Sequence, residues 1–125
     1  MIAGIGTDIV AIARMAEFWQ RHGQRALAKL LAPDERADCL AASEPARFLA
    51  KRFAAKEALG KAFGTGIRAP LLLPEISIQH EALGRPGFVF GATLAACFAE
   101  RGLSAHLSIS DEQTHAIAFV ILETR

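Results

Sequence analysis

Residues 45–66 have the sequence PARFLAKRFAAKEALGKAFGTG, the longest stretch of the chain with a helical pattern. Proline is favoured at the first position of a helix, and glycine is favoured just beyond its end. At 100° per residue, the large apolar side chains fall within one arc of about 140°: Phe48, Leu49, Phe53, Leu59 and Phe63. The stretch therefore predicts a long helix that starts at Glu44-Pro45, packs on the core and ends at Gly64-Thr65-Gly66.

Two cations, Arg52 and Lys56, point into the same core-facing arc of this predicted helix. A buried cation is costly unless an anion accompanies it, so both side chains require partners from the protein or from a ligand. A phosphate is a natural candidate. The glycines after the helix can present backbone N–H groups to an anion, although an ordinary C-cap explains Gly64 equally well.

The N-terminal segment Ile2–Val10 is a β-branched run that predicts a buried strand. Gly4 and Gly6 within it indicate that another backbone comes close to this strand. Asp8 lies in the same run, where a carboxylate is costly unless it is paired or binds a metal. Asp8 is therefore a candidate metal ligand, with the N-cap of a following helix as the alternative.

Glu57 and Lys61 stand one turn apart on the long helix and can meet. A surface ion pair is the ordinary explanation of such spacing. Together with Asp8, however, they form a set suited to a magnesium-phosphate site, because Mg²⁺ is usually held by one or two carboxylates plus waters and substrate phosphates. Asp8 and Glu57 would hold the metal, and Lys61 would balance charge on the phosphates.

The rest of the chain contains shorter helical and alternating patterns. Further helices are predicted at Ala11–Leu31 with a break at His22-Gly23, from Pro33, and at Ala92–Arg101; further strands are predicted at Ile76–His80, Phe88–Phe90, Ala105–Ser110 and Ala116–Glu123, with a turn at Gly84–Gly87. Helices and strands thus come in separate groups. The predicted fold is a small single α+β domain over residues 1–125, with a largely antiparallel sheet packed on the long helix.

The composition excludes several classes of protein. The 125 residues are enough for one core, and a formal charge of +1 argues against a dedicated nucleic-acid binder. Cys39 and Cys97 lack metal-type spacing and predict small buried side chains in a reduced, cytoplasmic protein. No apolar run is long enough to predict a membrane span or a signal peptide. The 52% of hydrophobic residues weakly favours a subunit interface.

Near the C-terminus, the stretch 105–112 places polar side chains on one face of a strand. His106, Ser108 and Ser110 alternate with Leu107 and Ile109, which predicts that the two apolar residues face the core. The polar face could hold a phosphate or a ribose. An ordinary solvated strand face remains the alternative.

Four motifs together resemble one family. GIGTDIV (4–10), RFAAKEALGKAFGTG (52–66), GRP (84–86) and HLSISDE (106–112) are similar to motifs of the holo-acyl-carrier-protein synthases, which are 4′-phosphopantetheinyl transferases. The resemblance spans the chain from Met1 to the last predicted strand. It implies a 4′-phosphopantetheinyl transferase fold assembled as a trimer, with Mg²⁺ and coenzyme A bound at each subunit interface.

The resemblance also implies roles for individual residues. Asp8 and Glu57 match the metal ligands of the family, and Lys61 matches a lysine that contacts coenzyme A phosphates and can assist the leaving group. Six further positions match the coenzyme A site, counting the loop after the long helix: Arg52, Gly64, Thr65, Gly66, Pro86 and His106. Many relatives have histidine at the position of Asp111, so no role is carried over to Asp111.

The implied reaction moves 4′-phosphopantetheine from coenzyme A to a serine of apo acyl carrier protein in fatty-acid biosynthesis, releasing adenosine 3′,5′-bisphosphate. Acyl carrier proteins are acidic, so a basic helical surface should receive them. The candidates for docking are Arg14, Arg21 and Arg25, of which Arg14 also matches a family position. Ordinary solvated helix charge is the alternative for the other two.

Two other functions compete with this interpretation. A metal-dependent nuclease also uses two acids and a lysine, but its second acid and lysine are separated by one residue, whereas three residues separate Glu57 from Lys61. A non-catalytic module would bind coenzyme A without Mg²⁺ and would tolerate the loss of Glu57.

Overall fold

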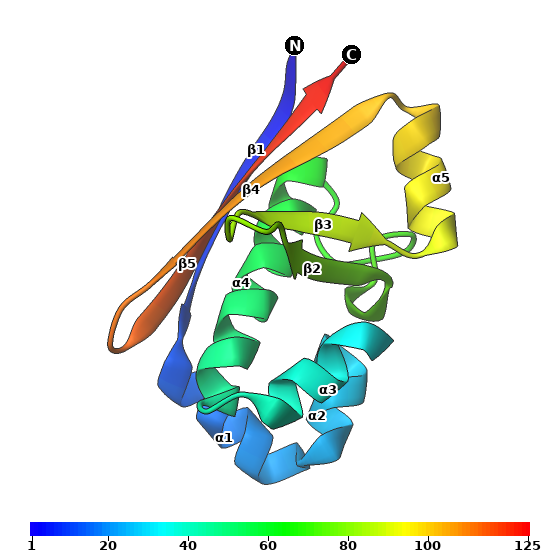
Figure 1. Ribbon diagram of the computed structural model, residues 1–125. Helices are drawn as coiled ribbons and strands as arrows, with labels where there is room; N and C mark the ends of the chain where they lie inside the picture. Colours follow the sequence, from blue (N-terminus) through cyan, green and yellow to red (C-terminus); the bar gives the residue numbers. More distant parts are fainter.

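The computed structural model describes residues 1–125 and contains five strands, five α-helices and one short 3₁₀-helix. In chain order they are β1 (Ile2–Ala11), α1 (Ile12–His22), α2 (Gln24–Leu30), α3 (Pro33–Ala41), α4 (Pro45–Phe63), η1 (Leu73–Glu75), β2 (Ile76–His80), β3 (Pro86–Phe90), α5 (Ala92–Glu100), β4 (Leu103–Asp111) and β5 (His115–Thr124). Figure 1 shows the two termini at one end of the molecule and α1–α3 at the other.

The strands form two antiparallel sheets. One has three strands in the order β1-β5-β4, and the other is the β2-β3 hairpin. Helix α4 lies against the three-stranded sheet, with the hairpin on its other side (Figure 1). The predicted α+β fold, with a largely antiparallel sheet packed on the long helix, is confirmed.

Small residues let α4 lie very close to strand β1. A Cβ atom added to Gly4 would overlap the carbonyl oxygen of Ala62, and one added to Gly6 would overlap that of Ala58. The prediction that another backbone approaches β1 at its glycines is thus confirmed. The prediction of a buried strand is wrong for the other face of β1, where Ile5 is 60% exposed.

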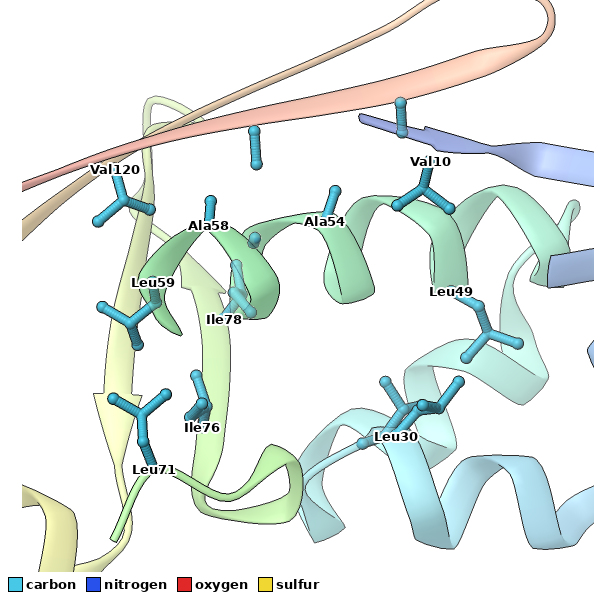
Figure 2. Packing of buried hydrophobic residues seen from close by; sticks show 14 of the residues in the cluster. Val10, Leu30, Leu49, Ala54, Ala58, Leu59, Leu71, Ile76, Ile78 and Val120 are labelled. Atoms are coloured by element: carbon cyan, nitrogen blue, oxygen red, sulfur yellow. The ribbon is translucent and has the colours of Figure 1, made fainter. Parts of the chain in front are cut away.

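The core continues on the other side of α4 with larger side chains. In Figure 2, Ala54 and Ala58 point toward the sheet, whereas Leu59 points away from it, to the side where Ile76 of the hairpin and Leu71 lie. All of these residues are buried. Alanines set the short distance to the sheet, and leucines fill the wider space toward the hairpin and the N-terminal helices.

The end of α4 confirms the glycine C-cap. Gly64 has the left-handed conformation (φ 95°), and its N–H donates to the carbonyls of Gly60 (3.1 Å) and Lys61 (3.2 Å). The N–H of Gly66 also donates to the Gly60 carbonyl, at 3.0 Å. Both glycine N–H groups are therefore used within the chain and are not free for an anion.

The predicted boundaries differ from the structure by a few residues. The break at Gly23 is confirmed, but the predicted turn at 84–87 is shorter, because Pro86 and Gly87 already pair with His80 and Gln79 in the hairpin. A proline is compatible with the first position of an edge strand, where its missing N–H costs no ladder bond. None of the helices is both long enough and apolar enough to span a bilayer.

Candidate active site

Asp8 and Lys61 meet where β1 lies against α4. The Nζ of Lys61 donates to Asp8 Oδ1 at 3.1 Å and to the carbonyl of Thr7 at 2.9 Å. Asp8 does not cap α1, whose N-cap is Ala11 without a side-chain hydrogen bond. The N-cap alternative is therefore wrong, because the strand continues for three residues beyond Asp8 before the helix begins.

Glu57 is half-buried on α4 and close to this pair. Burial raises its pKa, the charge of Asp8 raises it further, and Lys61 and Arg14 oppose the shift. The ion-pair partner of Lys61 is Asp8 and not Glu57. The ordinary surface pair along the helix is thus absent, and the structure instead brings two carboxylates and a lysine together from elements 53 residues apart.

This donor set fits a divalent cation. Asp8 and Glu57 are hard oxygen donors, and no third His, Cys, Asp or Glu side chain joins them in a preformed cage. Mg²⁺ needs only one or two carboxylates because waters and phosphates complete its shell. Burial is the main cause of the raised pKa of Glu57 and the charge of Asp8 adds to it, and a cation beside the two acids would oppose both effects.

The buried cations of α4 find their anion within the protein. Lys56 is fully buried and donates to Glu35 Oε1 at 2.7 Å, and Arg52 Nε lies 3.7 Å from Glu35 Oε2. Burial lowers the pKa of both cations, and the nearby Glu35 opposes that shift. The sequence reasoning missed Glu35. Its available signal was a carboxylate at the third position of the helix that Pro33 opens, where glutamate completes a capping motif.

Arg52 also lines a cavity of about 160 Å³ between α4, the hairpin and β4. Its lining includes three basic side chains, one proline and one acid: Lys51, Arg52, His80, Pro86 and Asp111. Partial burial and the charges of Arg52 and Lys51 lower the pKa of His80. The acid is neutralised by Arg47, whose Nη1 lies 2.8 Å from Asp111 Oδ2. The cavity is therefore suited to an anion.

His106 lies on the outer face of the three-stranded sheet. Its Nε2 is 3.0 Å from Glu123 Oε1, and both side chains are exposed. Ser108 and Ser110 share this exposed face, while Leu107 is half-buried toward the core. The predicted alternation is confirmed, although nothing in a single chain brings His106 to the Arg52 cavity.

One chain therefore holds two separate groups of candidate residues. Asp8, Glu57 and Lys61 lie on the β1 side of α4, and Arg52 lies with Pro86 on the hairpin side. Arg52 and Glu57 are five residues apart, which turns them about 140° from each other on a helix. The Gly64–Gly66 loop follows the C-terminal end of α4, near Lys61.

The predicted docking residues lie at the end formed by α1 and α2. Arg14 is exposed, its guanidinium carbon is 5.6 Å from the centre of the Phe53 ring, and its charge acts on Glu57. Arg21 forms an exposed ion pair with Glu17 at 3.1 Å. Arg25 is exposed in the first turn of α2. Arg14 is thus the docking candidate nearest to the two carboxylates.

Known proteins are similar to this chain in fold and in sequence. A family model described as the 4′-phosphopantetheinyl transferase superfamily matches residues 4–120. The holo-[acyl-carrier-protein] synthase of Dechloromonas aromatica is 56% identical over 123 residues, covering 98% of each chain. The crystal structure of holo-[acyl-carrier-protein] synthase from Neisseria meningitidis matches with a TM-score of 0.95 and 45% identity, over 99% of this chain and 100% of that chain.

A third relative was solved with a ligand. The holo-(acyl-carrier-protein) synthase of Bacillus anthracis, in complex with CoA (3′,5′-ADP), matches with a TM-score of 0.84 and 31% identity, over 100% of this chain and 99% of that chain. The resemblance predicted from the four sequence motifs is confirmed by these matches. The chain is a transferase and belongs to the 4′-phosphopantetheinyl transferase superfamily.

Proposed function

We propose that this enzyme transfers 4′-phosphopantetheine from coenzyme A to a serine of apo acyl carrier protein, in fatty-acid biosynthesis. The observation that carries the proposal is the meeting of Asp8, Glu57 and Lys61 between β1 and α4. The names of the relatives and the CoA bound to the Bacillus anthracis protein support the choice of substrates.

The serine hydroxyl oxygen attacks the β-phosphorus of coenzyme A and forms a phosphodiester. The bond from that phosphorus to the bridging pyrophosphate oxygen breaks, and adenosine 3′,5′-bisphosphate leaves. Glu57 accepts the serine proton, directly or through a water, and its raised pKa brings its basicity closer to neutral pH. Lys61 lies beside Asp8 and stabilises the charge that develops on the departing phosphate.

Asp8 and Glu57 would hold a Mg²⁺ ion. When bound, this ion polarises the pyrophosphate oxygens and offsets the charge that develops on them. The remaining predicted contacts with coenzyme A fall to Arg52, Pro86, His106 and the Gly64-Thr65-Gly66 loop. Since the two glycine N–H groups cap α4, the loop contributes through its shape and through Thr65.

A homotrimer with its active sites at the subunit interfaces is part of the proposal. The outer face of the sheet carries exposed apolar side chains on neighbouring strands: Ile5, Ile9, Ile117 and Phe119. The two groups of candidate residues also lie on different sides of α4, so two chains could each supply one group. Sedimentation equilibrium tests this, because a monomeric mass of 13.4 kDa at micromolar concentration would contradict it.

We further propose that residues 1–125 form a single transferase domain that works in the cytoplasm. One continuous core of 23 buried residues joins all the layers, and the family model matches 4–120. Both cysteines are free. Fractionation of cells that express the protein checks its location.

Transfer itself is tested by mixing the protein with apo acyl carrier protein, coenzyme A and Mg²⁺. Mass spectrometry should record the phosphopantetheine mass on the carrier, and a chelator should abolish the increase. A mass increase that survives chelation would contradict the metal role. No increase, with coenzyme A still bound, would favour the non-catalytic module, and cleavage of nucleic acid would favour the nuclease.

Reversing Arg14 to glutamate is expected to raise the KM for the carrier protein by about 10-fold and the KM for coenzyme A by less than about 2-fold. Arg14 faces solvent and its charge reaches Glu57, so it can attract the acidic carrier to the site before transfer. Arg125→Glu, at the opposite end of the molecule, is the matched control (Figure 1). An unchanged carrier KM in the Arg14 variant would exclude this docking surface.

A further inference from the structure

Glu35 joins three elements of the fold at one buried point. Its Oε1 accepts hydrogen bonds from the backbone N–H of Ala32 (2.9 Å) and from Lys56 Nζ (2.7 Å). Its Oε2 accepts one from the backbone N–H of Ile78 (3.0 Å) and faces Arg52 Nε at 3.7 Å. Glu35 is 1% exposed. It thereby ties α3, β2 and α4 together without touching solvent.

One carboxylate here serves two cations, and the two are not equivalent. Lys56 is 0% exposed, and its ammonium group donates three hydrogen bonds within the protein, to Glu35 and to the carbonyls of Leu30 and Leu73. Its charge is therefore fully enclosed. Arg52 makes a longer contact with the carboxylate and reaches the wall of the cavity. The surplus positive charge of the three side chains is thus presented to the cavity by Arg52.

The guanidinium of Arg52 is held on three sides. Its Nη1 donates to the carbonyl of Ile78 at 2.8 Å, its Nε faces Glu35, and its carbon lies 4.5 Å from the centre of the Phe48 ring. Its Nη2 has no partner within the chain. A planar guanidinium fixed in this way offers one free edge, which suits a phosphate.

Ile78 shows how Glu35 and Arg52 depend on each other. The carboxylate accepts from the N–H of Ile78, and the arginine donates to the carbonyl of the same residue. Glu35 therefore fixes both the charge that faces Arg52 and the strand carbonyl to which Arg52 is anchored. Loss of the carboxylate would free the arginine to swing, although Glu35 itself cannot reach a ligand.

We propose that Glu35 is a positioning residue, which holds Arg52 in the orientation that binds a phosphate group of coenzyme A. The inference rests on the proposed function for the identity of the ligand. Its test is a binding measurement, so that a failure of transfer and a failure of this inference remain distinguishable.

Glu35→Gln keeps the shape of the side chain and removes its charge. Titration calorimetry with adenosine 3′,5′-bisphosphate should find binding weakened by about 10-fold, the order expected when one hydrogen bond to a charged group is weakened. In the transfer assay, the KM for coenzyme A should rise similarly while kcat stays within about 3-fold. Asp34→Asn is the matched control on the same helix, because Asp34 bonds to Ser77 and Gln79 and not to Arg52. Equal weakening by both variants would contradict the proposal.

The glutamine variant leaves Lys56 buried without its counter-ion, which could unfold the protein. The double variant Glu35→Gln with Lys56→Met removes both charges of that pair and should fold. If Glu35 positions Arg52, the double variant still binds the bisphosphate about 10-fold more weakly than the parent. Parental affinity in a folded double variant would overturn the proposal.

Variants of Arg52 decide whether Glu35 acts through it. In an Arg52→Met background, adding Glu35→Gln should weaken binding no further, and additive losses would contradict the proposal. Arg52→Lys keeps a positive charge and loses the planar group that Glu35 and Ile78 orient. It should bind the bisphosphate about 10-fold more weakly. Unchanged affinity in this variant would overturn the proposal even if no Glu35 variant folds.

Discussion

Replacing Glu57 by glutamine is expected to lower kcat for transfer by about 10³-fold, because one change removes both a metal donor and the acceptor of the serine proton. Glutamine has the same shape and is neutral, so both the cost of burying a charge and the repulsion from Asp8 disappear, and the fold should keep its stability. Mass spectrometry of the carrier over time gives the rate.

The control for this variant is Glu100→Gln, which changes an exposed glutamate at the end of α5. Its kcat should equal that of the parent. Direct titration of Mg²⁺ into each protein in the presence of coenzyme A separates the two roles of Glu57. Loss of a metal donor weakens Mg²⁺ binding, whereas loss of the proton acceptor does not. A Glu57 variant whose kcat falls less than about 10-fold would show that another group takes the proton.

Gly6→Ala is expected to lower the free energy of unfolding by about 3 kcal/mol, the upper range for overpacking a tight contact. The added Cβ would overlap the carbonyl oxygen of Ala58 and press on the backbone N of Ala62 at 2.7 Å. These are backbone atoms in the C-terminal part of α4, so they cannot turn aside as the end of a side chain can. The helix and strand must separate instead.

Urea unfolding followed by the fluorescence of Trp19, the single tryptophan, measures this loss at fixed protein concentration. Gly87→Ala is the matched control, because Gly87 also lies in a strand and a Cβ there meets nothing within 4 Å. Its stability should change by less than about 0.5 kcal/mol. If both alanine variants unfold at the same urea concentration, the tight contact carries no energetic weight.

Local patterns predicted much of the fold. The helix Pro45–Phe63, its glycine cap and the alternation around His106 depend on neighbouring residues, and all three are confirmed. The close backbone approach at Gly6 was also predictable, because glycine has no side chain and so lets another backbone come near. The exposure of Ile5 could not be predicted in this way, because it depends on which strands pair and which face α4 covers.

The sequence was enough to predict which residues form the candidate site, but not which of their side chains pair with each other. Asp8, Glu57 and Lys61 are distinctive by chemical type and spacing. That Lys61 pairs with Asp8 and not with Glu57 depends on contact between residues 53 apart. The carboxylate that serves Lys56 lies 21 residues away on another helix, where nothing in the local pattern distinguishes Glu35 from a helix-starting acid.

The close contact between β1 and α4 also controls the spacing of the candidate metal ligands beside it. Asp8 follows Gly6 by two residues on the same face of the strand, and Glu57 directly precedes Ala58 on the helix. The gap between these backbones therefore sets how far apart the two carboxylates stand. A larger residue that widened the gap would move the two carboxylates apart and weaken their binding of a small cation, without changing either acid. Small residues such as Gly6 and Ala58, which have no functional group, would therefore be selected because they keep the two carboxylates at the right distance.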